Sequence, residues 1–97
     1  MRKITDKVVR GGFQIGKAVK LGNTLSTGDK LYLYGNRIAY RKDGKLYITI
    51  AEWSTSTTRE RLSAIYGVKV TQRKGQLYLN GMKWDGNEVC VDDFMSR

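Results

Sequence analysis

The side chains that most often perform catalysis are scarce in this sequence. It contains no histidine, the usual general acid or base near neutral pH, and a single cysteine, Cys90. The familiar zinc sites and the cysteine–histidine nucleophile pair need more of these residues than the chain has. The glycine-rich loop that cradles phosphates together with its lysine is also missing. We therefore expect a protein that binds rather than catalyses, with no catalytic residue, no metal and no cofactor.

Carboxylates are concentrated at the C-terminal end of the chain. Residues 1–83 carry 17 basic and 5 acidic side chains, a net charge of +12, whereas residues 84–97 carry 1 basic and 4 acidic side chains, a net charge of −3. The four acids could hold a hard cation, but they lack the spacing of a calcium-binding EF-hand loop. We interpret them as a solvated acidic terminus: Asp85, Glu88, Asp92 and Asp93.

The net positive charge of residues 1–83 limits the kinds of partner that the protein is expected to bind. The whole chain has a net charge of +9. Such a charge attracts polyanions, whether nucleic acid, nucleotides or an acidic protein face, although it can also serve solubility alone. No apolar run approaches the roughly 18 residues of a membrane span, so we expect no membrane partner. A lone cysteine, which has no partner for an internal disulfide, fits a reducing cytosol.

Tyrosines interleaved with basic residues form the first candidate site. If the leucines and isoleucines between residues 30 and 50 face a core, strand geometry turns the tyrosines and cations outward, although the strand over 37–42 could face either way. Bases stack on such rings while cations follow phosphates, so the pattern is typical of a surface for single-stranded nucleic acid. The face could equally be a protein interface, and tyrosine also favours strands without any ligand. The candidates are Tyr32, Tyr34, Arg37, Arg41, Lys45, Tyr47 and Tyr78.

Two further groups of side chains could contact a phosphate. Hydroxyls and arginines meet where a helix is expected to start, and free backbone N–H groups there attract anions, unless the hydroxyls only cap the helix. This anion candidate comprises Ser54, Ser56, Thr57, Thr58, Arg59 and Arg61. The other group is a basic hairpin tip, Arg73 and Lys74, which could touch phosphates or be an ordinary solvated turn.

Two short helices are expected to position these groups. Before the first, Thr5 or Asp6 can cap the free N–H groups, and Gly11 and Gly12 end or kink the helix. Its apolar stripe is Ile4, Val8, Val9 and Phe13. The second follows Trp53: the run from Thr57 to Glu60 has the form of a capping box, and Gly67 suits a left-handed C-terminal cap.

Hairpin strands account for most of the remaining chain. Alternating runs separated by turn residues predict strands at 30–34, 37–42, 45–50, 68–71, 76–79, 82–84 and 88–91, with a further strand near 18–25. The expected fold is one α+β domain over 1–97: a mostly antiparallel sheet of hairpins with two short helices packed on one face. Residues 83–97 would form its acidic C-terminal strand and tail.

One stretch of sequence echoes another 46 residues later. Leu31-Tyr32-Leu33-Tyr34-Gly35 is similar to Leu77-Tyr78-Leu79-Asn80-Gly81. Two helix-plus-hairpin halves could therefore share one sheet. Simple recurrence of hairpin chemistry explains the echo equally well.

Three motifs can be picked out: the run from Leu33 to Ala39, the run from Ala51 to Leu62, and the run from Gln72 to Gly81 with Trp84-Asp85-Gly86. Together they resemble a family of small proteins encoded by tailed bacteriophages. The resemblance implies a viral protein in the bacterial host cytoplasm and implies no particular activity.

Three functions follow as hypotheses. The first is a non-catalytic accessory protein that binds and inhibits a host factor, plausibly a component of bacterial defence. The second is a nucleic-acid-binding protein that uses the basic, tyrosine-rich face. The third is a binder of a phosphorylated small molecule, such as a signalling nucleotide, at the start of the second helix. Unpaired sheet edges would favour a homodimer.

Overall fold

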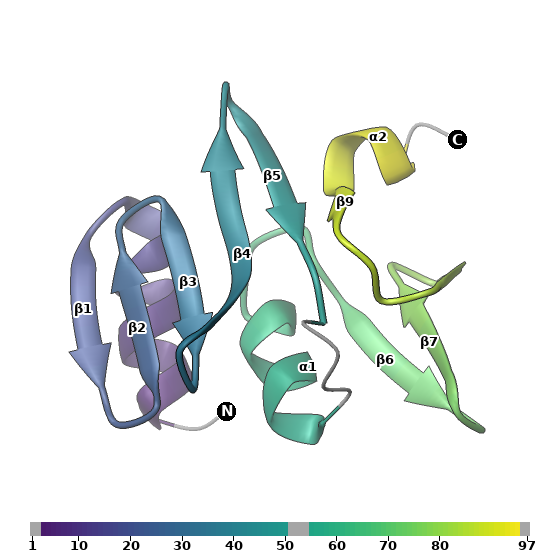
Figure 1. Ribbon diagram of the computed structural model, residues 1–97, viewed down its shortest axis with the longest axis horizontal. Coiled ribbons are helices and arrows are strands. Elements are labelled where there is room, and N and C mark those ends of the chain that lie inside the picture. The colour runs from purple at the N-terminus through teal and green to yellow at the C-terminus, as the bar shows by residue number, and fades with distance from the viewer. Residues whose placement is uncertain (1–2, 51–54, 96–97) are drawn as a thin grey trace.

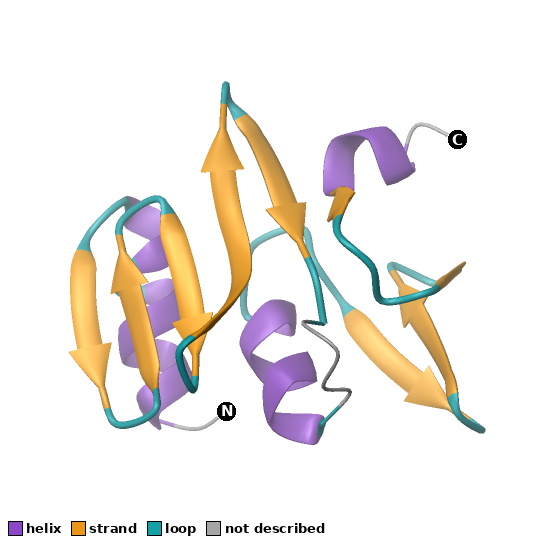
Figure 2. Cartoon of the chain, viewed as in Figure 1, coloured by secondary structure: helices purple, strands orange, loops and turns teal. Residues whose placement is uncertain are grey.

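Short helices and hairpin strands alternate along the residues that the structure, a computed structural model, describes: 3–50 and 55–95 (Figures 1 and 2). The helical segments are η1 (Thr5–Arg10), η2 (Phe13–Ile15), α1 (Ser56–Ser63) and α2 (Val91–Met95). The strands are β1 (Ala18–Leu21), β2 (Thr24–Thr27), β3 (Lys30–Leu33), β4 (Asn36–Lys42), β5 (Lys45–Ile48), β6 (Val70–Arg73), β7 (Gln76–Leu79), β8 (Met82–Trp84) and β9 (Val89–Cys90).

The first helix forms and ends as its sequence predicts, but it is capped differently. η1 is a single stretch of π-helix, followed at Gly11 and Gly12 by the 3₁₀-helix η2. A Cβ on Gly12 would stand 2.4 Å from the carbonyl oxygen of Val8, so a glycine is needed for this close approach. The predicted cap at Thr5 or Asp6 is wrong: Ile4 is the N-cap and makes no side-chain cap bond. The apolar stripe is confirmed by the full burial of Val8, Val9 and Phe13.

Six strands form the larger sheet, in the order β1-β2-β3-β4-β5-β9 and antiparallel throughout. Asp43 and Gly44 both have positive φ, 53° and 77°, as the predicted hairpin turn between β4 and β5 requires. The single strand predicted near 18–25 is wrong, because Gly22 and Asn23 turn the chain there and divide it into β1 and β2. The last strand, β9, returns from the C-terminal end of the chain to pair with β5.

The second meander makes a sheet of its own, in the order β6-β7-β8. The α+β class is therefore confirmed, whereas the expectation of one shared sheet is wrong. On the inner face of the larger sheet, Leu31 and Ile48 are fully buried in one core with Val8 of η1 and Leu62 of α1. Figure 1 shows the purple N-terminal helix crossing behind β1, β2 and β3. The two predicted helices thus pack on the same side of this sheet.

The echo in the sequence corresponds to a repeated piece of structure. β2 and β3 begin at Thr24 and Lys30, and β6 and β7 begin at Val70 and Gln76, a shift of 46 residues in both cases. The pairing register shifts by the same amount: Tyr32 is opposite Leu25 and Arg37, and Tyr78 is opposite Thr71 and Lys83. The backbone hydrogen bonds at the turns correspond too. The N–H of Tyr34 donates to the carbonyl oxygen of Asn23, and the N–H of Asn80 donates to the carbonyl oxygen of Lys69, both at 2.8 Å. The two three-stranded meanders therefore have one architecture, in agreement with a duplication.

Candidate functional site

The face of the larger sheet turned away from η1 and α1, called the outer face here, gathers tyrosines and cations. Directly opposed residues of paired strands lie on the same face, so the register identifies its members. Strands β1–β5 contribute no acidic side chain to either face. The outer face carries Lys20, Leu25, Lys30, Tyr32, Arg37, Tyr40, Lys42, Lys45 and Tyr47.

A stack of three side chains from β4 and β5 lies on the outer face. The rings of Tyr40 and Tyr47 are 5.0 Å apart and inclined by only 7°, and the guanidinium of Arg37 lies 4.3 Å from the Tyr40 ring centroid. Burial of the phenol, followed by a hydrogen bond to the carboxylate of Glu88 and the charge of that carboxylate, raises the pKa of Tyr40. The stack already offers aromatic surface and positive charge side by side, the combination that single-stranded nucleic acids require.

A bulge decides which arginine of β4 belongs to this face. The register of β3 and β4 shifts between Leu31 and Tyr32, and Ile38 and Ala39 are both buried. Arg37 and Tyr40 therefore share the outer face, although an unbroken alternation would separate them.

The expectation that Arg37 and Arg41 face the same way is wrong. The Arg41 guanidinium lies 4.2 Å from the ring centroid of Phe13, on the inner side. Its Nη2 donates to the carbonyl oxygens of Phe13 and Gly28, the latter at 2.8 Å. Arg41 thus anchors η2 and a turn and lies outside the outer face.

The acidic C-terminal segment lies against one edge of the outer face. Glu88 comes within 3.8 Å of Arg37, and Asp93 of α2 comes within 3.7 Å of Lys45. All four side chains remain 44% to 69% exposed, so these are weak surface ion pairs. The segment is also more ordered than a solvated tail, because α2 buries Val91 and Phe94.

The opposite end of the outer face is hollowed. Tyr34 lies beyond β3 in a left-handed turn with φ of 52°, and its side chain is 69% exposed. Together with Lys20, Leu25 and Tyr32 it borders a pocket of about 280 Å³. Tyr34 therefore belongs to the rim of the face rather than to the strand that the alternation predicts.

The start of α1 does not gather the predicted anion site into one place. Thr55 is the N-cap, and its hydroxyl accepts from the N–H of Thr58 at 3.2 Å, so the capping box predicted from Thr57 to Glu60 is wrong. Arg59 donates to the amide oxygen of Gln72 at 2.5 Å. Ser56 is exposed and Thr57 half-buried, while Ser54 lies outside the described residues.

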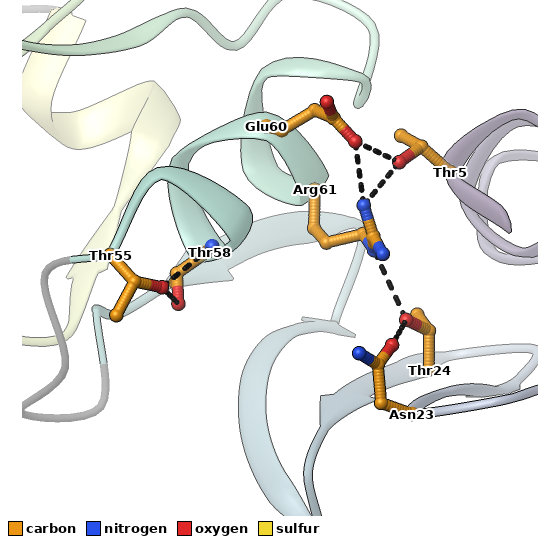
Figure 3. A network of polar contacts seen from close by, with 7 residues as sticks. All are labelled: Thr5, Asn23, Thr24, Thr55, Thr58, Glu60 and Arg61. Carbon is orange, nitrogen blue, oxygen red and sulfur yellow. Dashed lines mark hydrogen bonds and ion pairs between the residues drawn. The ribbon is translucent and has the colours of Figure 1, made fainter. Parts of the chain in front are cut away.

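Arg61 points into the protein instead of toward a ligand (Figure 3). It is fully buried, and its Nε donates to the Thr24 hydroxyl at 3.0 Å. Its Nη1 donates to the Glu60 carboxylate at 2.6 Å and to the hydroxyl of Thr5. The Thr5 hydroxyl also donates to Glu60 at 2.5 Å. This network, called the Arg61 network below, joins α1 to η1 and β2.

The remaining predicted residues lie on the second sheet. Arg73 and Lys74 are exposed at the β6–β7 turn, where Lys74 and Gly75 have positive φ. Tyr78 is half-buried and faces outward opposite Lys83. Sequence reasoning missed Lys83 as well as Lys20 and Lys42. Lys83 could have been found from the 46-residue offset of the sequence echo, because it is the position that corresponds to Arg37 in the second meander.

Three further observations bear on the kind of protein this is. No helix among the described residues is long and apolar enough to cross a membrane. Within 3–50 and 55–95, His, Cys, Asp and Glu side chains form no group of three that could hold a metal ion. Cys90 is a free thiol and is buried.

Comparisons with known proteins identify the family. No curated protein and no solved structure matches the chain. The family described as Kyanoviridae Gp96 protein matches residues 1–96. The match agrees with the resemblance to small phage proteins, and the chain belongs to the Kyanoviridae Gp96 protein family.

Proposed function

We propose that this phage accessory protein is a non-catalytic binder of single-stranded nucleic acid in the bacterial host cytoplasm, and that it binds through the outer face. The observation that carries the proposal is that three tyrosines and five cations lie together on one face of the sheet. The bulge in β4 is what places Arg37 and Tyr40 on the same face, and strands β1–β5 contain no acidic residue. Because 11 of the 16 Lys and Arg residues that the structure describes lie elsewhere, the high charge of the chain alone does not account for this grouping.

The arrangement suits a flexible strand better than a duplex. Tyr32 and the hollow beside Tyr34 offer ring surface for unpaired bases, and stacking of one base on an aromatic ring contributes about 1–3 kcal/mol. Lys30 precedes Tyr32 by two residues on β3, Arg37 is opposite it on β4, and Lys20 lies two strands away on β1, so cations on the same face can follow the phosphates. Stacking tolerates any base, so the proposal predicts little sequence preference.

Fluorescence anisotropy with a labelled oligodeoxythymidylate of about 20 nucleotides, long enough for the usual site sizes, tests the proposal. Binding at about 50 mM salt should weaken as salt rises, with a log–log slope near −0.7 for each phosphate contacted. Arg37→Ala should weaken binding and flatten the slope. Lys7→Ala is the matched control, since it removes one exposed cation from η1, on the other side of the sheet. An absence of binding at that salt concentration would end the proposal.

Binding and inhibition of a host factor is the second candidate, and one observation favours it. Glu88 and Asp93 show that carboxylates of a polypeptide can approach the cations of the outer face, so an acidic protein surface could do the same. Capture from infected cells with the wild type and with Arg37→Ala tests it. The expected result is a host protein that is retained only by the wild type and is inhibited by it in a purified assay. Recovery of nucleic acid alone would refute it.

We do not propose a phosphorylated small molecule at the start of α1, because Arg61, the innermost cation of that candidate, is fully buried within the protein. A homodimer remains a prediction. β1 and β9 end the larger sheet and β6 and β8 end the smaller one, so each sheet has edges where a second chain could pair.

A further inference from the structure

Each of the two meanders presents a tyrosine with a cation directly across the strand pair. Tyr32 of β3 is opposite Arg37 of β4, and Tyr78 of β7 is opposite Lys83 of β8. Directly opposed side chains have Cβ atoms about 4.5–5.5 Å apart and lie on the same face. Both pairs obey the 46-residue offset, and both tyrosines are half-buried. The tyrosine–cation pair is therefore a feature of the repeated unit.

The surface beside each tyrosine is hollowed at the corresponding place. The pocket of about 280 Å³ on the first meander is bordered by Leu25, Tyr32 and Gly35. A pocket of about 430 Å³ on the second is bordered by Thr71, Tyr78 and Gly81, the residues 46 positions later. The first volume is just below the range for small-ligand sites, about 300–1,000 Å³, and the second is near its lower end, which suits one nucleotide unit rather than a folded protein.

The turn beside each pocket is open in the same way. Gly35 and Gly81 have φ of 78° and 86°, and no described atom outside each glycine and its two chain neighbours lies within 4 Å of the point where a Cβ would stand. The residues before them, Tyr34 and Asn80, share a positive φ of 52° and 51°. A base could therefore reach either tyrosine ring past a bare turn.

Each pocket is also bordered by a cation, although from a different place. Lys20 of β1 borders the first pocket, and Arg73 of β6 borders the second. Arg37 and Lys83 are opposite the tyrosines in the strand register without bordering the pockets, so each meander carries two cations on the same face as its tyrosine. This is the composition needed to stack one base and to neutralise the phosphates on both sides of it.

We propose that the chain carries two equivalent nucleotide-stacking subsites, one on each meander, centred on Tyr32 and Tyr78. This inference rests on the proposed function and extends it to the second sheet, which the outer face does not include. The ligand is a single strand, DNA or RNA, whose bases stack on both tyrosines.

Single substitutions in the full chain test the inference with the same labelled oligodeoxythymidylate, and with an oligouridylate of equal length to distinguish DNA from RNA. Tyr32→Ala and Tyr78→Ala should each weaken binding by about 5- to 150-fold, the factor that corresponds to one lost stack. Tyr32→Phe and Tyr78→Phe keep the ring and should bind within about 3-fold of the wild type, less than the loss of one stack. The control is Tyr66→Ala, because Tyr66 is 88% exposed and borders neither pocket. Thermal unfolding of each variant reports whether it folds.

The outcomes separate this inference from the proposed function. If Tyr78→Ala folds and binds as tightly as Tyr66→Ala while Tyr32→Ala is weakened, the second subsite is refuted and the proposed function stands. If a Phe variant loses as much as the Ala variant at the same position, stacking is refuted. If the wild type binds neither strand, both ideas fail. Equal losses in the two Ala variants, with recovery by Phe, support two equivalent subsites, and the tighter of the two strands identifies the preferred nucleic acid.

Discussion

Replacement of Arg61 by methionine should destabilise the protein more than loss of any cation on the outer face. Methionine fills a similar volume but has no charge and no donors, so the Glu60 carboxylate loses the Nη1 that now lies 2.6 Å away. The hydroxyls of Thr5 and Thr24, both fully buried, lose a donor as well. Breaking a buried ion pair by removal of one partner costs about 3–5 kcal/mol.

The partial exposure of Glu60 places the expected loss of unfolding free energy near the lower end of that range. Its side chain is 30% exposed, so water can solvate part of the carboxylate that Arg61 leaves behind. We therefore expect Arg61→Met to lower the free energy of unfolding by about 3 kcal/mol. At about 4–8 °C per kcal/mol for a domain of this size, Tm should fall by about 12 °C or more.

Chemical denaturation of four proteins measures the effect: the wild type, Arg61→Met, Glu60→Gln and the double variant. Because the two residues are in contact, their coupling should amount to about 0.5–3 kcal/mol. The control is Arg37→Met, whose partner Glu88 is at 3.8 Å and exposed, so its ion pair contributes about 0–1 kcal/mol. A loss below about 1 kcal/mol in Arg61→Met would refute the view that this network holds α1 in place.

Three further predictions concern the turns and the edge of the outer face. Gly12→Ala should lower the free energy of unfolding by about 1–3 kcal/mol, because the new Cβ would stand 2.4 Å from a backbone oxygen. Gly35→Ala has open space around the Cβ and should cost only the roughly 1 kcal/mol of an alanine in the left-handed conformation. Equal losses of the two variants in chemical denaturation would contradict this. Folding raises the pKa of Tyr40, so its phenol should contribute stability that is fully present below the ordinary tyrosine pKa of 10.0 and is lost as pH rises through the pKa in the folded protein. Spectrophotometric titration of the wild type and of Tyr40→Phe checks the direction of the pKa shift. Glu88→Gln should reduce that shift. The double variant Glu88→Gln, Asp93→Asn removes the carboxylates near Arg37 and Lys45 and should increase the rate of association with the labelled oligodeoxythymidylate at low salt; an unchanged rate would show that these acids do not compete with phosphates.

Local chemistry made much of the fold predictable. Positive φ at Asp43-Gly44 and Asn80-Gly81 follows from residue types that tolerate it, so the hairpins could be located from the sequence. The apolar stripe around Val8 likewise depends only on neighbouring residues. Elements defined by spacing along the chain were therefore found.

Features that depend on distant residues could not be predicted. The bulge at Ile38 and Ala39 follows from the pairing of two strands, and it reverses the side on which Arg41 lies. The partners that bury Arg61 are Thr24 and Thr5, which are 37 and 56 positions away. From the sequence, Arg61 was a surface cation beside a helix start, because nothing local indicates that α1 turns it inward.

The return of β9 to β5 has a consequence for the continuity of the chain. Everything from α1 through β8 lies between two neighbouring strands of one sheet, so this region is tethered at both ends. Cleavage at the exposed turn after Lys74 would give two fragments that still share the β6–β7 and β5–β9 ladders. Such fragments, expressed separately, should reassociate into the native protein. The chain could therefore be split at this turn, and reassembly of the two fragments could be measured.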